Sequence, residues 1–401
     1  MIQNFIHAAD TSSQSILFGT DCETYIATLH QRISKFEISK FLHIEISDKW
    51  LLASALQKCI RRGLALQSVA IAIRLHQIDQ VYLPRRMPII ALEDIGLGDA
   101  LVCHDVIAVC ASSKWWGADV NRTIGFLASI MAGAVKSRTA CDAFSLTEVH
   151  SDRNILLPNL LKCSAVDLID MACDRDLTQI ERLFALRVLG GITENRNGAY
   201  KVLSRCDIRA LESVGSKLEL PEVVCWLIAR QRKTAGMAAM LPIAFEAGHN
   251  AVVRTSREFP RALDNIAGLP LCTLDMYTKL GRTALKRFYQ TTKALQDFAS
   301  QHVRGHDPQP LINLAMFQTE SSLLNQFLSS PKLDDLKDIT DEAEMECLGM
   351  VNPANRHELY RLLRENSHFL ADIRIDMLKN LFLMQEGKIA NPPVQLTLNG
   401  C

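Results

Sequence analysis

Basic residues gather in one stretch near the beginning of the chain, and their spacing is typical of a phosphate-binding helix face. At about 100° per residue, Lys58, Arg61 and Arg62 fall within roughly a 100° arc, and Arg85-Arg86 follows. Guanidinium groups match phosphate oxygens bidentately. We therefore expect an exposed nucleic-acid-binding face here, whose cations stabilise the fold by only about 0–1 kcal/mol each. The alternative is that these cations pair with nearby acids or with a helix C-terminus.

A second basic stretch, LDMYTKLGRTALKRFYQTTKAL, interleaves cations with aromatic residues. Lys279, Arg282 and Lys286 are expected on one face of a helix, since the last two are four residues apart. Cations and aromatic rings together bind single strands through phosphate pairing and base stacking. We expect nucleic-acid binding here too, although core aromatics beneath a surface of cations would give the same pattern. The weakest set of this kind is Lys136, Arg138 and Asp142.

Three acids after the first basic stretch are candidates for metal binding. Glu93 and Asp94 are expected to bind nearby Arg side chains, because Arg86 lies seven residues before Glu93 and hence on the same helix face. Together with Asp99, these carboxylates could instead hold Mg²⁺ for phosphodiester chemistry. The sequence leaves open whether they are structural or hold a metal. Our prediction contains no metal site and no cofactor.

Other patterns that signal chemistry are missing from the sequence. It has no G-x-x-x-x-G-K-[ST] loop for nucleotide phosphates, no H-E-x-x-H zinc motif and no G-x-S-x-G nucleophile elbow. We therefore expect no ATP binding and favour a non-enzymatic protein. Two adjacent tryptophans, Trp115 and Trp116, are candidate anchors for a partner protein, unless one of them packs into the core.

The composition is that of a folded protein without long-range attraction to a polyanion. Apolar residues make up 48% and charged residues 22%, and 44 Lys+Arg balance 44 Asp+Glu. Any nucleic-acid binding must therefore come from a local patch. The most apolar runs fall well short of the roughly 20 residues that cross a bilayer, so no membrane contact is expected. Twelve cysteines without a C-x-x-C pair favour free thiols in a reducing cytoplasm.

Helical periodicity dominates the chain, and strand signals are nearly absent. We expect an all-α fold of antiparallel helices packed in layers. Ser47 or Asp48 is the expected N-cap of the helix that carries the first basic stretch, and Gly63 is its expected C′ residue. Residues 331–348 are acidic and are expected to form a solvated linker or helix face. The expected divisions are an N-terminal helical segment at 1–46, helical domains at 47–250 and 251–390, and a loose tail at 391–401.

The segment from Trp50 to Asp99 carries a family resemblance. It contains an Ala-Leu helix, a glycine break, an Ala-rich helix, Arg85-Arg86 and then Glu93-Asp94-Ile95-Gly96, in that order. In these features residues 47–110 resemble the helical domain of the RarA/MgsA replication-associated recombination proteins, which are clamp-loader-like AAA+ ATPases. The resemblance implies a clamp-loader-collar-like helical array, self-association and work at DNA or replication forks. It does not extend to the ATPase, because the phosphate-binding loop is missing.

The sequence thus predicts a cytoplasmic, non-enzymatic accessory or scaffold protein in DNA replication or recombination. Its expected partners are DNA and replication or recombination proteins, bound through a basic helix face, and a homo-oligomer is among the expected states. Two alternatives stay open. One is a protein-interaction or regulatory module without nucleic-acid contact, and the other is a metal-dependent enzyme that acts on nucleic acid.

Overall fold

The computed structural model describes residues 22–38, 44–111, 119–196, 199–256, 265–266 and 268–385. Helix accounts for 72% of the structure, and its strands are few and short. The predicted all-α fold is therefore confirmed, whereas its clamp-loader-collar-like detail stays a prediction. The candidate anchors Trp115 and Trp116 lie outside the described residues.

The helix predicted to carry the first basic stretch, α3, lies inside the N-terminal part of the molecule. It spans Lys49–Arg61, and the amides of Trp50 and Leu51 donate to the side chain of its N-cap, Asp48. Gly63 follows at φ +69°, the left-handed conformation of a C′ glycine, so both predicted helix ends are confirmed. The neighbouring elements are α2 (Cys22–Ser34), α4 (Ala65–Ile78), α5 (Tyr82–Ile90), η2 (Ala91–Ile95), η3 (Gly96–Gly98), α6 (Ala100–Ala111) and α7 (Val120–Gly133).

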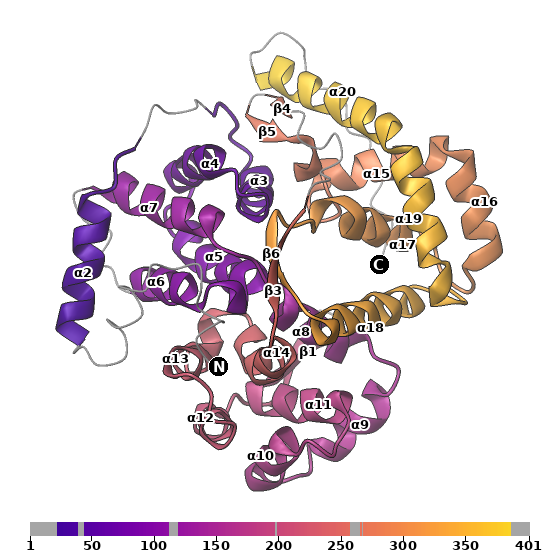
Figure 1. Ribbon diagram of the computed structural model, residues 1–401. Coiled ribbons are helices and arrows are strands. Elements are labelled where there is room, and N and C mark those ends of the chain that lie inside the picture. The colour runs from indigo at the N-terminus through magenta and orange to yellow at the C-terminus, as the bar shows by residue number, and fades with distance from the viewer. Residues whose placement is uncertain are drawn as a thin grey trace.

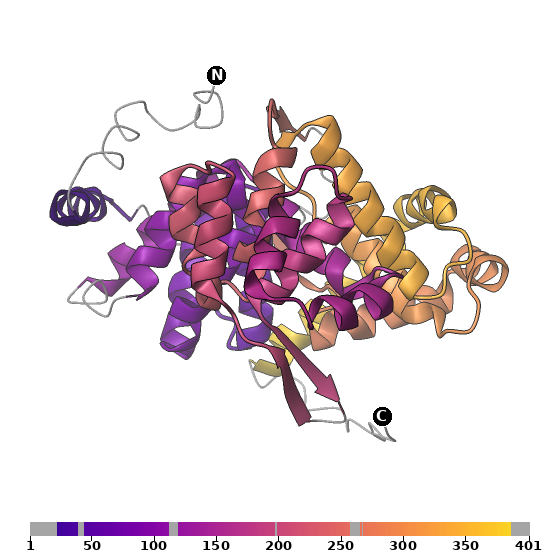
Figure 2. The ribbon, with the colours of Figure 1, turned by 90° about the horizontal axis from the view of Figure 1, so that it is seen from below.

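A second group of helices lies below the first in Figure 1. Helix α8 (Thr139–Val149) links this group to the C-terminal part, because it packs against both α11 and α18. A hairpin of strands β1 and β2 projects away from the body in Figure 2. The elements are α9 (Arg153–Leu160), α10 (Ala165–Cys173), α11 (Gln179–Gly190), β1 (Ile192–Arg196), β2 (Ala199–Ser204), α12 (Ile208–Lys217), α13 (Glu222–Ile228), η5 (Gln231–Lys233), η6 (Met237–Met240) and α14 (Leu241–Ala247).

The C-terminal helices lie across a two-stranded ribbon from the N-terminal helices (Figure 1). Strands β3 (Val252–Thr255) and β6 (Gln326–Ser329) form this ribbon as an antiparallel pair. The acidic stretch at 331–348 is not a linker but a helix, α18 (Pro331–Cys347), which buries one face against α8. The remaining elements are β4 (Asn265–Ile266), β5 (Leu269–Pro270), η8 (Leu271–Thr273), α15 (Lys279–Thr291), α16 (Lys293–His302), α17 (Pro308–Met316), η9 (Phe317–Ser321), η10 (Pro353–Asn355), α19 (Arg356–Glu365) and α20 (Ser367–Gln385).

Two clusters of buried apolar side chains form the core. The larger extends from Leu29 to Leu274 and includes a few residues of α18 and α20, whereas the smaller lies between Ala284 and Leu370. We call the surface along which residues 44–256 meet residues 268–385 the junction. Backbone hydrogen bonds cross it at Arg61, whose carbonyl accepts from Asn325 at 3.0 Å, at Lys136 and Ser256, and along the β3–β6 pair.

Each side of the junction carries a π-helical turn, a rare conformation that is frequent at functional sites. One is η2, which continues α5, and the other is η9, which continues α17. Each turn buries an acid, Asp94 in η2 and Glu320 in η9, at 0% and 4% exposure. Buried charges need partners, so the junction is where ionic chemistry concentrates in this fold.

Two expectations drawn from the composition, on membrane-spanning helices and on cysteine, also find support. None of the helices in the described part of the chain is both long and apolar enough to span a membrane. The ten cysteines whose side chains the structure describes are free.

Candidate functional site

The cations of α3 were expected on an exposed face, and this expectation is wrong. Lys58, Arg61 and Arg62 are only 2%, 1% and 4% exposed. From Leu51 onward every residue of α3 is buried, because α4 and α7 cover one side and the C-terminal segments at η8 cover the other. A cation in this position does not reach the phosphates of a bound nucleic acid. The basic arc faces the junction instead.

Arg61 is held by the acids of η2. Its Nε donates to Asp94 Oδ1 at 2.6 Å, and its Nη2 donates to Glu93 Oε1 at 3.0 Å. Across the junction its Nη1 donates to the carbonyl oxygen of Ser321 at 3.0 Å. Burial alone would raise the pKa of Asp94, but the charges of Arg61 and Arg138 outweigh burial and lower that pKa. Arg61 thus pairs with acids, as the alternative interpretation had it, but the pair is buried and not at the surface.

Lys58 and Arg62 bind groups that lie more than 200 residues further along the chain. Lys58 pairs with Asp275, and burial lowers the pKa of Lys58 against the attraction of that carboxylate. Arg62 donates to the carbonyl oxygen of Glu320 at 2.9 Å and also contacts the Cys272 sulfur. These contacts make the two cations structural ties across the junction.

Of the predicted nucleic-acid-binding pair Arg85 and Arg86, which lies on α5, only Arg85 is exposed to solvent. Arg86 donates to Gln57 at 2.7 Å and lies 3.7 Å from Glu93, so the prediction that Arg86 and Glu93 share a helix face is confirmed.

Helix α15 presents its basic residues to solvent, as predicted. Lys279, Arg282 and Lys286 are exposed, and so is Arg287. The helix contains no acid, and in the described part of the chain none of these four cations has an ion-pair partner. The side that packs on the core consists of Gly281, Ala284, Leu285 and Phe288.

The metal-site alternative finds no ligand set in the described residues. There, no group of three or more His, Cys, Asp or Glu side chains is placed to hold an ion. Glu93 and Asp94 are turned toward Arg61 and Arg138, whereas Asp99 caps the start of α6. Glu93 and Asp94 are therefore engaged in ion pairs with arginines, which compete with a metal ion for the same oxygens.

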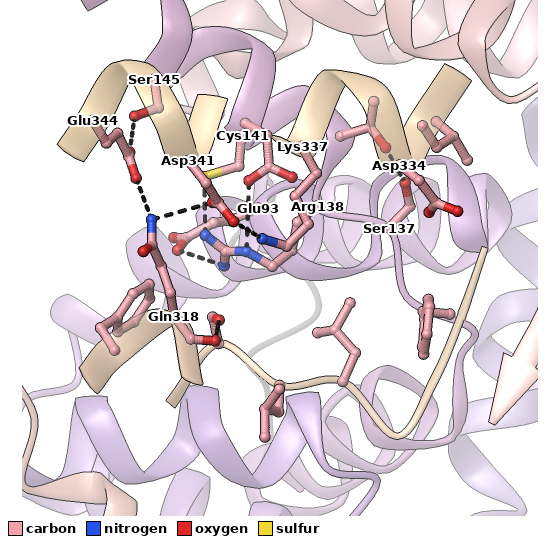
Figure 3. Close-up of a pocket in the computed structure, with 18 of the residues that line it drawn as sticks. Glu93, Ser137, Arg138, Cys141, Ser145, Gln318, Asp334, Lys337, Asp341 and Glu344 are labelled. Atoms are coloured by element: carbon pink, nitrogen blue, oxygen red, sulfur yellow. Dashed lines mark hydrogen bonds and ion pairs between the residues drawn. The ribbon is translucent and has the colours of Figure 1, made fainter. Parts of the chain in front are cut away.

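A cavity of about 320 Å³ opens at the junction between α8, α18 and η9. Its volume lies at the lower end of the range of small-molecule sites, roughly 300–1,000 Å³. Figure 3 shows the labelled polar side chains of α8 and α18 gathered along one side, with Gln318 reaching toward them from η9. Apolar residues complete the lining: Leu314, Phe317, Leu323, Leu324, Phe327, Leu328 and Leu333.

Arg138 forms one end of the polar wall. Its Nη1 donates to Asp94 Oδ1 at 2.8 Å and to Glu93 Oε1 at 3.4 Å, and its Nε lies 3.9 Å from Asp142. Its guanidinium also lies 5.8 Å from the Phe317 ring centroid. Arg138 is thus surrounded by carboxylates and is already satisfied.

A hydrogen-bonded chain forms the other end of the polar wall. The Tyr360 hydroxyl donates to Gln318 Oε1 at 2.7 Å, which turns the Gln318 amide nitrogen toward α18. That nitrogen donates to both Asp341 Oδ1, at 3.1 Å, and Glu344 Oε2, at 2.9 Å. The Ser145 hydroxyl donates to the other oxygen of Glu344. Two carboxylates therefore share one amide donor at the cavity wall (Figure 3).

Burial raises the pKa values of two carboxyl groups in this wall, those of Glu344 and Asp142. Burial raises the pKa of Glu344, and the negative charges of Asp341 and Asp142 raise it further against the hydrogen bond from Ser145. Burial also raises the pKa of Asp142, although Arg138 opposes that rise. The wall is therefore short of positive charge.

The cavity has no activated nucleophile among the residues that line it. Burial raises the pKa of the Cys141 thiol, so Cys141 is not a thiolate near neutral pH. The Ser145 hydroxyl donates to a carboxylate, and no histidine lines the cavity to act as its base.

Sequence reasoning missed this cavity. Lys136, Arg138 and Asp142 appeared as the weakest basic set, yet Arg138 and Asp142 line the cavity, whereas Lys136 is fully buried and does not line it. Burial lowers the pKa of Lys136 to about 8. A signal was present in residues 331–348, where seven acids face only two lysines.

Comparisons with protein-family models, curated proteins and solved structures find no similar protein. The resemblance of residues 47–110 to the RarA/MgsA family therefore stays a prediction.

Proposed function

We propose that the chain is a non-enzymatic accessory protein that binds the phosphate backbone of nucleic acid through helix α15. The proposal keeps the expected partner and, of the two predicted basic stretches, retains the one on α15 and drops the buried one on α3. The setting in DNA replication or recombination rests on the resemblance of residues 47–110 alone. The proposal includes no catalytic step.

The observation that carries the proposal is the set of cations on α15 without ion-pair partners. At about 100° per residue, Lys279, Arg282, Lys286 and Arg287 fall within roughly a 140° arc. Some other exposed cations are paired, as Lys293 is with Asp297 and Arg361 with Glu365, whereas the four on α15 gather on one face without an acid beside them. Cations that lack partners keep their charge available for a polyanion on an otherwise neutral chain.

The geometry of α15 fits a nucleic-acid strand. Lys279 and Lys286 are separated by about 10 Å along the helix axis at roughly 1.5 Å per residue. That distance spans about three phosphates of one strand at roughly 3.4 Å each. Tyr277 is exposed just before the helix, and its ring offers a surface on which a base can stack. At the same end of the helix, Arg282 donates to the carbonyl oxygen of Met276 at 3.3 Å.

An anionic membrane fits the same face less well. Helices that lie on a membrane bury an apolar face in the headgroup region. On α15 the apolar residues Ala284, Leu285 and Phe288 are buried in the protein core. The outward face, which includes Thr283 and Gln290, is polar throughout. A polyanion without a lipid phase is therefore the better partner.

The test is a fluorescence-anisotropy titration with a labelled single-stranded oligonucleotide at about 50 mM and about 200 mM salt. Four phosphate contacts on a single strand predict a slope of log K against log salt of about −2.8. The double variant Arg282→Ala with Lys286→Ala should weaken binding and reduce the slope by about 1.4.

The matched control is Arg361→Ala with Arg364→Ala on α19. It removes the same net charge from an exposed surface elsewhere and should keep the wild-type slope. If both double variants lose affinity equally, the effect is one of net charge and α15 is not the site. If the wild type does not bind at the lower salt concentration, the protein-interaction module without nucleic-acid contact becomes the better interpretation.

A further inference from the structure

The cavity at the junction carries an excess of negative charge that the protein does not neutralise. Five carboxylates line it, and only two cations do: Glu93, Asp142, Asp334, Asp341 and Glu344 against Arg138 and Lys337. Arg61 and Arg86, which do not line the cavity, form ion pairs with Glu93. The fully buried Asp94, next to Glu93 in the chain, adds one more acid. A ligand that enters this space meets a negative wall.

Glu344 is the carboxylate that most clearly lacks a counter-charge. Both of its oxygens accept hydrogen bonds from neutral groups, Ser145 and Gln318. In the described part of the chain no Lys, Arg or His lies within ion-pair distance of it. A half-buried carboxylate without a cation is costly unless something else supplies positive charge.

The two cations of the wall are not available to an anionic ligand. Arg138 is occupied by Asp94, Glu93 and Asp142. Lys337 pairs with Asp341, one turn further along α18. An anion would therefore have to break an existing pair and would also face the charge of Glu344. The charge distribution selects against anions.

The opposite wall provides an apolar surface. Phe317 and Phe327 line the cavity, together with leucines from α17, from the segment after η9 and from α18. One edge of this wall is fixed, because the ring of Tyr277 packs edge-on against Phe317 at a centroid distance of 5.3 Å. A ligand that fills about 320 Å³ here buries an apolar body while its polar end meets the carboxylates.

We propose that this cavity binds a small organic amine, protonated at neutral pH, whose ammonium group lies between Glu344 and Asp341 and whose apolar body packs on Phe317 and Phe327. An ammonium group has three N–H donors and no acceptor, so it matches two carboxylates that already share one amide donor. A bare metal ion fits less well, since no group of three metal-binding side chains occurs in the described residues. The amine proposal does not use the cations of α15, although Tyr277 borders both sites.

The test measures the binding of three probe amines by isothermal titration calorimetry and ligand-observed NMR. The probes are 2-phenylethylamine, tryptamine and n-hexylamine, and their matched counterparts are 2-phenylethanol and 3-phenylpropanoate. The wild type should bind at least one amine and should bind neither the alcohol nor the carboxylate comparably. Equal binding of the three kinds of compound, or no binding of any probe amine, overturns the proposal.

The variant that removes the charge and keeps the shape is Glu344→Gln. It should weaken amine binding by about tenfold or more, because hydrogen bonds to charged groups are the strong ones. The matched control is Glu346→Gln, which removes the same charge from an exposed position of α18 that does not line the cavity. If Glu344→Gln binds the amine like wild type, the ammonium group does not lie at Glu344 and the proposal is wrong.

Two further readouts keep the outcome clear. Thermal unfolding of Glu344→Gln reports whether the variant is folded, and a second variant, Phe327→Leu, should weaken the phenyl probe without changing the charge. Oligonucleotide binding should be the same for Glu344→Gln and wild type. The amine site and the α15 contact can therefore fail separately.

Discussion

Replacing Arg61 by alanine should strongly destabilise the protein, although the helix pattern alone places Arg61 on a solvent-facing arc. The substitution removes three hydrogen bonds, to Asp94, Glu93 and the Ser321 carbonyl. It leaves the fully buried Asp94 with Arg138 and Gln57 only. Breaking a buried ion pair from one side costs about 3–5 kcal/mol, against about 0–1 kcal/mol for an exposed cation.

The assay is urea unfolding followed by circular dichroism, supported by calorimetry. At about 2.1 cal/mol/K of unfolding entropy per residue, a loss of 3–5 kcal/mol lowers the Tm of a single transition by about 4–6 °C. The control is Arg282→Ala, the same change on the exposed face of α15. If Arg61→Ala and Arg282→Ala both unfold within about 1 kcal/mol of wild type, the assignment of Arg61 as a structural tie is refuted.

Three further outcomes are expected. Because burial raises the pKa of Glu344, the folded protein binds that proton more tightly than the unfolded chain does. The free energy of unfolding should therefore fall as pH rises from the ordinary glutamate pKa through the raised one, and over that rise Glu344→Gln should gain stability relative to wild type in urea titrations. Amine affinity should change in the opposite sense: it should fall as pH is lowered through the same pKa, because the neutral acid no longer attracts an ammonium group. Calorimetry across this pH range measures the affinity, and an affinity that does not change with pH contradicts the prediction. Gly63→Ala should destabilise by more than about 1 kcal/mol, since its φ is +69° and an added Cβ would meet Asn325 Nδ2 at 2.1 Å. Gly133→Ala, with nothing within 4 Å of its added Cβ, should be neutral or stabilise by up to about 1 kcal/mol in the same unfolding assay.

Features set by local chemistry were predictable from the sequence. The N-cap at Asp48, the C′ glycine at Gly63 and the helical class all follow from short-range patterns, and the structure confirms them. The exposed cations of α15 follow in the same way, because the apolar residues at helical spacing opposite them form the buried side.

The position of α3 could not be predicted from its own residues. A helix pattern shows which side is more polar, but it does not show what covers that side. Here the partners of Lys58 and Arg62 are Asp275 and Glu320, which lie more than 200 residues away in the chain. A polar side that is covered by distant acids looks in the sequence like a polar side in water.

The cavity was unpredictable for a related reason. Its walls come from separate segments near Glu93, Arg138, Ser256, Tyr277, Phe317 and Glu344, and no single segment shows a binding motif. The seven acids of residues 331–348 were interpreted as a solvated surface, which holds for exposed residues such as Asp335. It fails for the acids that α18 turns toward α8.

The most direct test of the central claim, that α15 is the nucleic-acid contact, is lysine-reactivity footprinting by mass spectrometry with and without a single-stranded oligonucleotide. Lys279 and Lys286 on α15 should lose reactivity toward an amine-modifying reagent when the oligonucleotide binds. Lys293 and Lys332 are exposed on α16 and α18 and should react equally in both states, whereas the buried Lys58 should stay unreactive throughout. Protection of Lys293 or Lys332 with unchanged reactivity at Lys279 and Lys286 would contradict the claim.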